Sequence, residues 1–428
     1  MRAYDVVLFG ATGFTGDLTA GYLARHAPAD LRWALAGRNR GKLEAVRTRL
    51  AGIDDRFGSL DLLVADSGDP ASLRAVAEAT KVVITTVGPY LTHGEPLVAA
   101  CAEAGTDYVD LTGEPEFVDR MYLAHDRRAR ETGARLVHAC GFDSVPHDLG
   151  AWFTVQQLPE DVPLRVDGYV RAGGMPSGGT VLSALTIMSR LPAGARVARE
   201  RAAAEPRPAG RFARAPLGRP HRVAGAGWWA VPLPTIDAEV VRRSAAASER
   251  YGPDFTYRHF AAVKHLPVLA GGVAGAGALF AAAQVPPARR ALSRLLAPGS
   301  GPSPERRARS WFSVRFVGEG GGSRVVTEVS GGDPGYDETA KMLAESALCL
   351  ATDDLPATAG QVTTATAMGG ALVDRLTQAG IRFTTLVSGK VKLGLTHVNG
   401  KHAFCLVDAV ATDRTRHVDQ VDHPAQTP

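Results

Sequence analysis

The chain of 428 residues is long enough for two domains of roughly 100–200 residues each. Its 45% hydrophobic and 21% charged residues exclude a mainly disordered protein. The net charge of +4 is too weak a bias to predict binding of nucleic acid.

The cysteines and the N-terminal residues indicate the compartment. The four cysteines are scattered and form no CxxC pair, so we expect neither a disulfide framework nor a zinc signature, and we predict no metal site. The first apolar run lacks the small-residue cleavage site of a signal peptide. We therefore expect a cytoplasmic protein.

The first 140 residues alternate short apolar runs with segments of helical spacing. Helices are expected over 14–25 and 97–103. The expected strands are 4–10, 31–37, 60–66, 81–88, 106–111 and 134–140. Repeated βα units predict a doubly wound parallel sheet of the Rossmann type, which we assign to residues 1–145.

From about residue 145 the alternation stops, and a second α/β (α+β) domain is expected over 146–385. The expected helices are 181–191, 336–350 and 368–379. The expected strands are 164–172, 255–263, 310–319 and 323–332, the last two as an antiparallel hairpin. Residues 192–222 are predicted to form a loop or a frayed helix. A C-terminal extension, 386–428, is expected to end in a flexible tail.

A glycine-rich turn joins the first expected strand to the first expected helix. Glycines allow phosphate oxygens to approach backbone N–H groups at a helix N-terminus, where a Cβ atom would block them. The alternative is an ordinary tight turn, but the complete βαβ context favours dinucleotide binding. The predicted phosphate-binding residues are Gly10, Thr12, Gly13, Phe14, Thr15 and Gly16.

The second expected strand ends in Arg38 and Asn39, where an NAD-binding protein usually carries an acidic residue. A guanidinium can pair with the 2′-phosphate of NADP and stack on its adenine. The alternative is a surface arginine at a helix start. We therefore predict NADP(H) rather than NAD(H) as the cofactor.

The third and fourth expected strands supply the remaining cofactor contacts. Asp66 and Ser67 can face the adenine or, alternatively, cap a helix over 69–78. Val87, Gly88 and Pro89 follow the fourth strand, at the carboxyl edge where ligands of open α/β sheets collect. We expect them to run beneath the nicotinamide.

These motifs resemble the saccharopine dehydrogenase-like oxidoreductases, and within them the trans-acting enoyl reductases. The resemblance covers about residues 3–385 and rests on GATGFTG, AGRNRGKL, TTVGPYLTHGEPLVAACAEAGTDYVDLTGE and HACGFDSVPHDLG. It implies a Rossmann domain followed by an α/β domain with a mixed sheet. It also implies NADPH-dependent reduction of an enoyl thioester on a polyketide or lipid assembly line.

Enoyl reduction adds a hydride to one alkene carbon and a proton to its neighbour, and a positioned acid assists the second step. The predicted candidates are Tyr90, His93 and Asp143. Each has an alternative role: Tyr90 can cover the nicotinamide, His93 can be a solvated loop residue, and Asp143 can cap a helix over 147–155. Further polar residues expected at the same edge are Glu114, Ser144 and His147.

Two segments suggest partners. The stretch from Arg190 to Arg222 contains nine arginines. It can form a docking face for an acidic acyl carrier protein or for the phosphates of coenzyme A, or else a solvated loop. Residues 265–288 carry no Asp, Glu, Lys or Arg. This segment can span a membrane, form a lipid-contacting surface or acyl tunnel, or form a helical hairpin buried in a domain or homodimer interface.

The function expected from these features is NADPH-dependent reduction of a hydrophobic, carrier-bound acyl substrate. Two alternatives remain open at this point. One is a saccharopine-type C–N dehydrogenase, and the other is a non-catalytic, membrane-associated NADP-binding protein.

Overall fold

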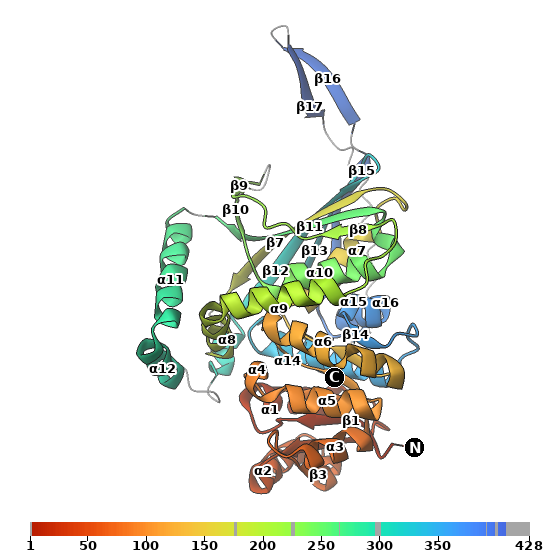
Figure 1. The fold of residues 1–428 in the computed structure, drawn as a ribbon, viewed down its shortest axis with the longest axis vertical. Helices are drawn as coiled ribbons and strands as arrows, with labels where there is room; N and C mark the ends of the chain where they lie inside the picture. The colour runs from red at the N-terminus through yellow and green to blue at the C-terminus, as the bar shows by residue number, and fades with distance from the viewer. Residues whose placement is uncertain are drawn as a thin grey trace, which may run out of the picture.

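A computed structural model gives the architecture. It describes residues 2–174, 178–223, 227–264, 266–295, 301–390, 392–398 and 401–407. Two large sheets, seen in the lower and upper halves of Figure 1, organise the chain.

The first sheet is parallel throughout and has the strand order β14-β6-β5-β4-β1-β2-β3. Its strands are β1 (Tyr4–Phe9), β2 (Trp33–Gly37), β3 (Asp61–Val64), β4 (Thr80–Thr85), β5 (Asp107–Val109), β6 (Arg135–Val137) and β14 (Gly360–Val362). The first six confirm the expected βα series. The seventh returns from far along the chain and was not expected from the sequence.

Both faces of this sheet are covered, which explains its continuous apolar strands. Val7 and Phe9 of β1 pack with helices α3 (Pro70–Ala79), α5 (Glu95–Ala104) and α6 (Pro115–Thr132). Val6 and Leu8 face the opposite side, which is covered by α1 (Phe14–His26), α2 (Arg40–Ala51) and α14 (Asp337–Thr352). The doubly wound Rossmann-type arrangement is therefore confirmed.

The second sheet is mixed, as the resemblance implies. Its order is β15-β13-β12-β7-β11-β10-β9, and β8 pairs with β11. The strands are β7 (Leu164–Gly173), β8 (Phe212–Arg214), β9 (His221–Arg222), β10 (Trp229–Pro232), β11 (Asp254–Val263), β12 (Trp311–Gly320), β13 (Ser323–Gly331) and β15 (Arg382–Lys390). The hairpin of β12 and β13 is confirmed, and β15 extends this sheet past residue 385.

Helices lie between the two sheets in Figure 1. Helix α7 (Val145–Val155) packs on β7, β12 and β13, and α10 (Ile236–Ala247) packs on β11. Helix α9 (Leu191–Ala204) contacts α6, so the expected loop over 192–222 begins instead as a regular helix. Pro192 in its first turn and its many Ala and Arg residues explain this difference. The other helices of this part of the chain are α8 (Gly178–Ser189), α15 (Thr364–Ala367) and α16 (Gly369–Gln378).

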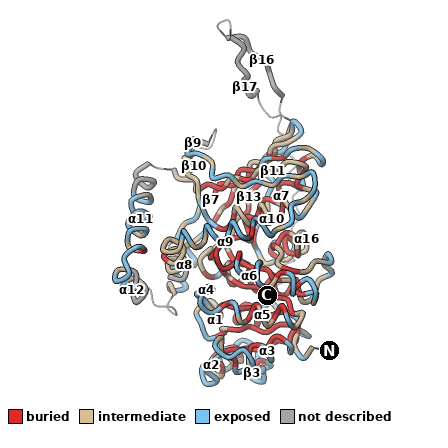
Figure 2. The backbone as a smooth tube through the Cα atoms, viewed as in Figure 1, coloured by how far each residue is buried: buried red, intermediate tan, exposed pale blue. Residues whose placement is uncertain are grey.

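The charge-free segment 265–288 contains all of α11 (Leu266–Gln284) and the first residues of α12 (Pro286–Leu295). Helix α11 lies at one side of the molecule against α8, and Figure 2 shows its outer surface as exposed. Phe280 and Val285 are 44% and 49% exposed. The interpretation as a hairpin buried inside a domain is therefore wrong. Among the described residues, no helix combines the length and hydropathy needed to span a bilayer.

Beyond β15 the chain forms an antiparallel pair, β16 (Lys392–Val398) and β17 (Lys401–Val407). The polar end of the extension beyond Val418, which is expected to be flexible, lies outside the described residues.

Candidate cofactor and active site

The glycine loop leads from β1 into α1 with the geometry that a pyrophosphate site requires. Gly10 has a φ of 92°, in the left-handed region that favours glycine. A Cβ atom at Gly16 would lie 2.2 Å from the carbonyl oxygen of Gly10, so the helix can approach the strand only with glycine at this position. No side chain caps the first turn of α1 at Gly13. Its N–H groups are therefore available for an anion.

The other residues of the glycine loop are either accessible to a ligand or packed against the rest of the chain. Thr12 and Gly13 are exposed, and Thr15 is half-buried. The ring of Phe14 turns away and packs edge-on against Tyr336, with 4.9 Å between the ring centroids. Only the backbone of Phe14 is therefore left to face a phosphate.

The end of β2 presents one unpaired cation. Arg38 is exposed and has no ion-pair or hydrogen-bond partner among the described residues, whereas Arg40 pairs with Glu44 at 3.1 Å. Asn39 caps α2, because its Oδ1 accepts a hydrogen bond from the Lys42 amide at 2.9 Å. Arg38 is therefore free to pair with a 2′-phosphate, whereas the Asn39 side chain is engaged at the start of α2.

At the end of β3, the cap of α3 is Asp69 and not Asp66 or Ser67. The Asp69 side chain accepts a hydrogen bond from the Ala71 amide. The Asp66 carboxylate instead accepts from the Gly68 amide at 2.8 Å. The predicted capping role of Asp66 and Ser67 is wrong, and both remain half-buried beside the adenine edge of the predicted site.

The loop after β4 carries Val87, Gly88 and Pro89 to the carboxyl edge of the sheet. Gly88 and Pro89 are exposed there, and Val87 lies against Gly10. The next residue begins the short helix α4 (Tyr90–His93). The buried Glu114 accepts hydrogen bonds from the Tyr90 amide at 3.2 Å and the Leu91 amide at 2.9 Å. Glu114 thus holds the loop that would lie beneath a nicotinamide.

Two of the predicted proton donors, Tyr90 and His93, lie in opposite environments. The Tyr90 hydroxyl is buried, donates to the Thr85 carbonyl at 3.2 Å and accepts from the Leu111 amide at 3.1 Å. Burial and the nearby Asp110 raise the pKa of Tyr90 well above its usual value. His93 is exposed at the end of α4 and has no hydrogen-bond partner among the described residues.

Asp143 has the properties of a proton donor. Its carboxyl group lies against Gly113, where an added Cβ would be 3.5 Å from Oδ2, and it has no hydrogen-bond partner within the described chain. Burial and the charge of Asp237 raise the pKa of Asp143 to about 6, against an opposing effect of His147. The N-cap of α7 is Ser144, so the predicted capping role of Asp143 is wrong.

Sequence reasoning did not find Asp110, which organises the loops after β5 and β6. Its fully buried carboxylate accepts hydrogen bonds from Tyr108, the Thr112 amide and the Ala139 amide, and lies 2.7 Å from His138 Nδ1. Ala139 has a φ of 59°, a strained value for a residue with a Cβ atom. In the sequence, the place of Asp110 at the end of an expected strand was the one feature that could have marked it as a site residue.

His147, Asp237 and His259 form a buried group near Asp143. His147 Nδ1 is 3.0 Å from one Asp237 oxygen, and His259 Nε2 is 3.6 Å from the other. Burial alone would raise the pKa of Asp237, but the neighbouring histidines hold it below its usual value. Burial lowers the pKa of His259 to about 4, so this ring is neutral at pH 7. Only His147 of the three was considered from the sequence.

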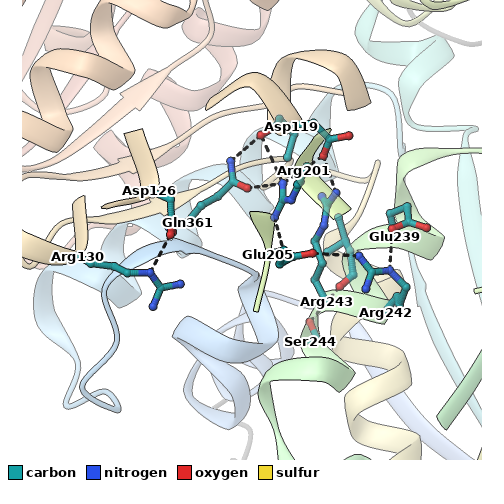
Figure 3. Close-up of polar contacts among 12 residues, drawn as sticks. Asp119, Asp126, Arg130, Arg201, Glu205, Glu239, Arg242, Arg243, Ser244 and Gln361 are labelled. Atoms are coloured by element: carbon teal, nitrogen blue, oxygen red, sulfur yellow. Dashed lines mark hydrogen bonds and ion pairs between the residues drawn. The ribbon is translucent and has the colours of Figure 1, made fainter. Parts of the chain in front are cut away.

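The arginines between 190 and 222 do not form one face. Figure 3 shows Arg201 inside a buried ion network, where it contacts Asp119 at 3.2 Å, Glu205 at 2.9 Å and Gln361 at 2.6 Å. Arg190 pairs with Glu116. These contacts join α6, α9 and β14, so both arginines serve the packing of the two domains.

Further along this segment, Arg211 donates to the carbonyl groups of Ala245 and Ser248 at the C-terminal end of α10, and Arg214 pairs with Asp254. Arg219 and Arg222 differ, because they have no ion-pair partner among the described residues. Together with Arg258 they line a cavity of about 600 Å³ on the second sheet.

Comparisons with known proteins identify the family of the chain. Residues 6–137 match the family described as the saccharopine dehydrogenase NADP binding domain. A protein of Mycobacterium tuberculosis, provisionally named a trans-acting enoyl reductase, is 39% identical over 416 residues, which cover 90% of this chain and 98% of that protein. The trans-acting enoyl reductase of Mycobacterium ulcerans is 36% identical over 413 residues, or 89% and 97% of the two chains.

Among solved structures, the apo saccharopine dehydrogenase (L-Glu forming) of Saccharomyces cerevisiae has the same fold. Its TM-score is 0.54 at 12% identity, over 90% of this chain and 100% of that chain. The predicted family, the mixed second sheet and NADPH as the cofactor are confirmed. The chain therefore belongs to the saccharopine dehydrogenase-like oxidoreductases, in the branch of the trans-acting enoyl reductases, and is an NADP-dependent reductase.

Proposed function

We propose that this reductase saturates the carbon–carbon double bond of a hydrophobic enoyl thioester carried by an acyl carrier protein or coenzyme A. The observation that carries the proposal is the 36–39% identity, over about nine-tenths of the chain, to proteins named trans-acting enoyl reductases. When bound, NADPH supplies the hydride that this reduction needs.

Residues of the chain would bind the cofactor, position the loop beneath the nicotinamide and supply the proton. The amides at the start of α1 bind the pyrophosphate, and Arg38 pairs with the 2′-phosphate. Glu114 fixes the loop of Gly88 and Pro89 from below. Asp143 holds a proton on its carboxyl group and delivers it to the carbon next to the thioester carbonyl, after which solvent restores the proton.

The test is single-turnover oxidation of NADPH by the purified full-length chain. We expect oxidation with an enoyl thioester and formation of the saturated acyl product. A keto acid mixed with an amine serves as the matched control, because oxidation with that pair alone would favour a C–N dehydrogenase. Binding of NADPH with no oxidation by either substrate would favour the non-catalytic alternative.

For the carrier, we propose docking at the cavity lined by Arg219 and Arg222, which suits the phosphate of a carrier arm. Reversing both charges should raise KM for the carrier-bound substrate with kcat unchanged. The same reversal of Arg196, which is exposed on α9 and pairs with Glu200, is the control. An equal KM in the two variants would contradict this docking site.

We also propose that α11 contacts a lipid surface. Its exposed apolar side chains, of which Phe280 is 44% exposed, would enter the interface, and the exposed Arg290 of α12 would face anionic headgroups. We expect the chain to sediment with anionic phosphatidylglycerol vesicles and Phe280→Asp to reduce this binding. Dimers in solution that Phe280→Asp dissociates, without vesicle binding, would instead assign α11 to a homodimer interface.

A further inference from the structure

Three elements of the second domain bring two histidines and a carboxylate together in the protein interior. His147 lies in the first turn of α7, Asp237 in the first turn of α10, and His259 within β11. They are only 2%, 4% and 3% exposed. One ligand-capable atom from each of the three lies within 4.8 Å of the others.

Hydrogen bonds within the described chain do not satisfy these atoms. His147 Nδ1 and Asp237 Oδ1 are 3.0 Å apart, yet neither has an aligned hydrogen-bond partner. His147 Nε2 and His259 Nε2 are also buried without one. Because buried polar atoms are normally satisfied, a group that is not part of the chain fits among them.

We propose that His147, Asp237 and His259 form a binding site for a divalent transition-metal ion of the zinc type. Imidazole nitrogen and carboxylate oxygen are preferred ligands of such ions. At tetrahedral angles and ligand bonds of about 2.0–2.2 Å, two ligand atoms are roughly 3.4 Å apart. The two histidine–carboxylate separations, 3.0 Å from His147 to one Asp237 oxygen and 3.6 Å from His259 to the other, lie on either side of that value.

A neighbouring side chain already orients one of the proposed ligands. The Tyr257 hydroxyl lies 3.0 Å from His259 Nδ1, which leaves Nε2 of the same ring directed at Asp237. Outer contacts of this type commonly fix the ring of a metal-binding histidine. The single negative charge of Asp237 would be offset by the ion.

The ion would act as a cross-link rather than as part of the hydride chemistry. It would join the first turn of α7, which begins two residues after Asp143, to α10 and β11. Metal content and thermal stability are measured without substrate or NADPH, so metal binding can be tested independently of the proposed enoyl reduction.

The test is the metal content of the untagged full-length chain, purified after growth with added zinc. We expect about one ion per chain by mass spectrometry. We also expect a higher melting temperature with Zn²⁺ than after chelation, and the visible absorption of four-coordinate Co²⁺ after reconstitution.

Asp237→Asn and His259→Gln should each weaken metal binding by roughly a hundredfold or more. His221→Gln, in β9 and outside the cluster, should retain the ion. Retention of full metal by a folded cluster variant would overturn the proposal. If those variants do not fold, the native chain decides, because absence of zinc, of a Co²⁺ spectrum and of a thermal shift overturns it equally.

Discussion

The carbonyl oxygen of Gly10 occupies the space that any side chain on residue 16 would need, since a Cβ at Gly16 would lie 2.2 Å from it. At Gly13 the same oxygen would be 3.5 Å away, an ordinary contact. Two glycines of one motif therefore have different physical roles: Gly16 allows the helix to pack on the strand, and Gly13 leaves room for phosphate.

Gly16→Ala should consequently affect stability, and Gly13→Ala should affect NADPH binding. We expect Gly16→Ala to lower the free energy of unfolding by about 1–3 kcal/mol, because backbone must move. Gly13→Ala should retain native stability but bind NADPH more weakly. Urea denaturation and calorimetry measure the two effects. Equal stability of both variants would contradict this division of roles.

Arg38→Asp should reverse the cofactor preference. Loss of a charge-assisted contact with the 2′-phosphate, worth about 1.5–3 kcal/mol, predicts roughly a tenfold to hundredfold weaker affinity for NADPH. NADH should bind at least as well as before. Arg40→Ala is the matched control, because Arg40 already pairs with Glu44. If only Arg40→Ala changed the preference between NADPH and NADH, Arg40 rather than Arg38 would bind the 2′-phosphate.

Asp143 should set the pH dependence of reduction. Burial and the charge of Asp237 raise the pKa of Asp143 to about 6, so its acid form predominates below pH 6 and is lost as the pH rises above it. We expect the rate to fall above pH 6 in chelator-treated protein. Asp143→Asn should remove this dependence and slow turnover by about 10²–10⁴-fold.

His93→Gln, measured over the same pH range, reports on the other titratable candidate. Its exposed position and lack of partners predict an unchanged profile. A profile that follows His93 rather than Asp143 would transfer the role of proton donor to His93.

Arg201 should contribute to stability rather than to docking. Arg201→Met leaves Asp119 and Glu205 with fewer partners in a buried network and should cost about 3–5 kcal/mol of unfolding free energy. Arg196→Met, in the same helix but exposed, should cost less than about 1 kcal/mol. Urea denaturation compares the two, and similar values would contradict the structural role of Arg201.

The sequence predicted those features that short stretches of chain encode by themselves. Apolar runs and helical spacing predicted the first six strands and the hairpin of β12 and β13. The glycine loop and Arg38 predicted the cofactor, because phosphate recognition depends on neighbouring backbone amides and one cation. Family motifs added the mixed second sheet and the chemistry of the relatives.

Only the tertiary structure decided the features that depend on contacts between distant segments. The strand β14 joins the first sheet across more than two hundred residues of chain, and α14 covers that sheet. The packed structure buries the Tyr90 hydroxyl against the Thr85 carbonyl and places Arg201 in an ion network with Asp119. His147, Asp237 and His259 are close together only because α7, α10 and β11 pack against one another. No local sequence pattern predicts such a contact between distant segments.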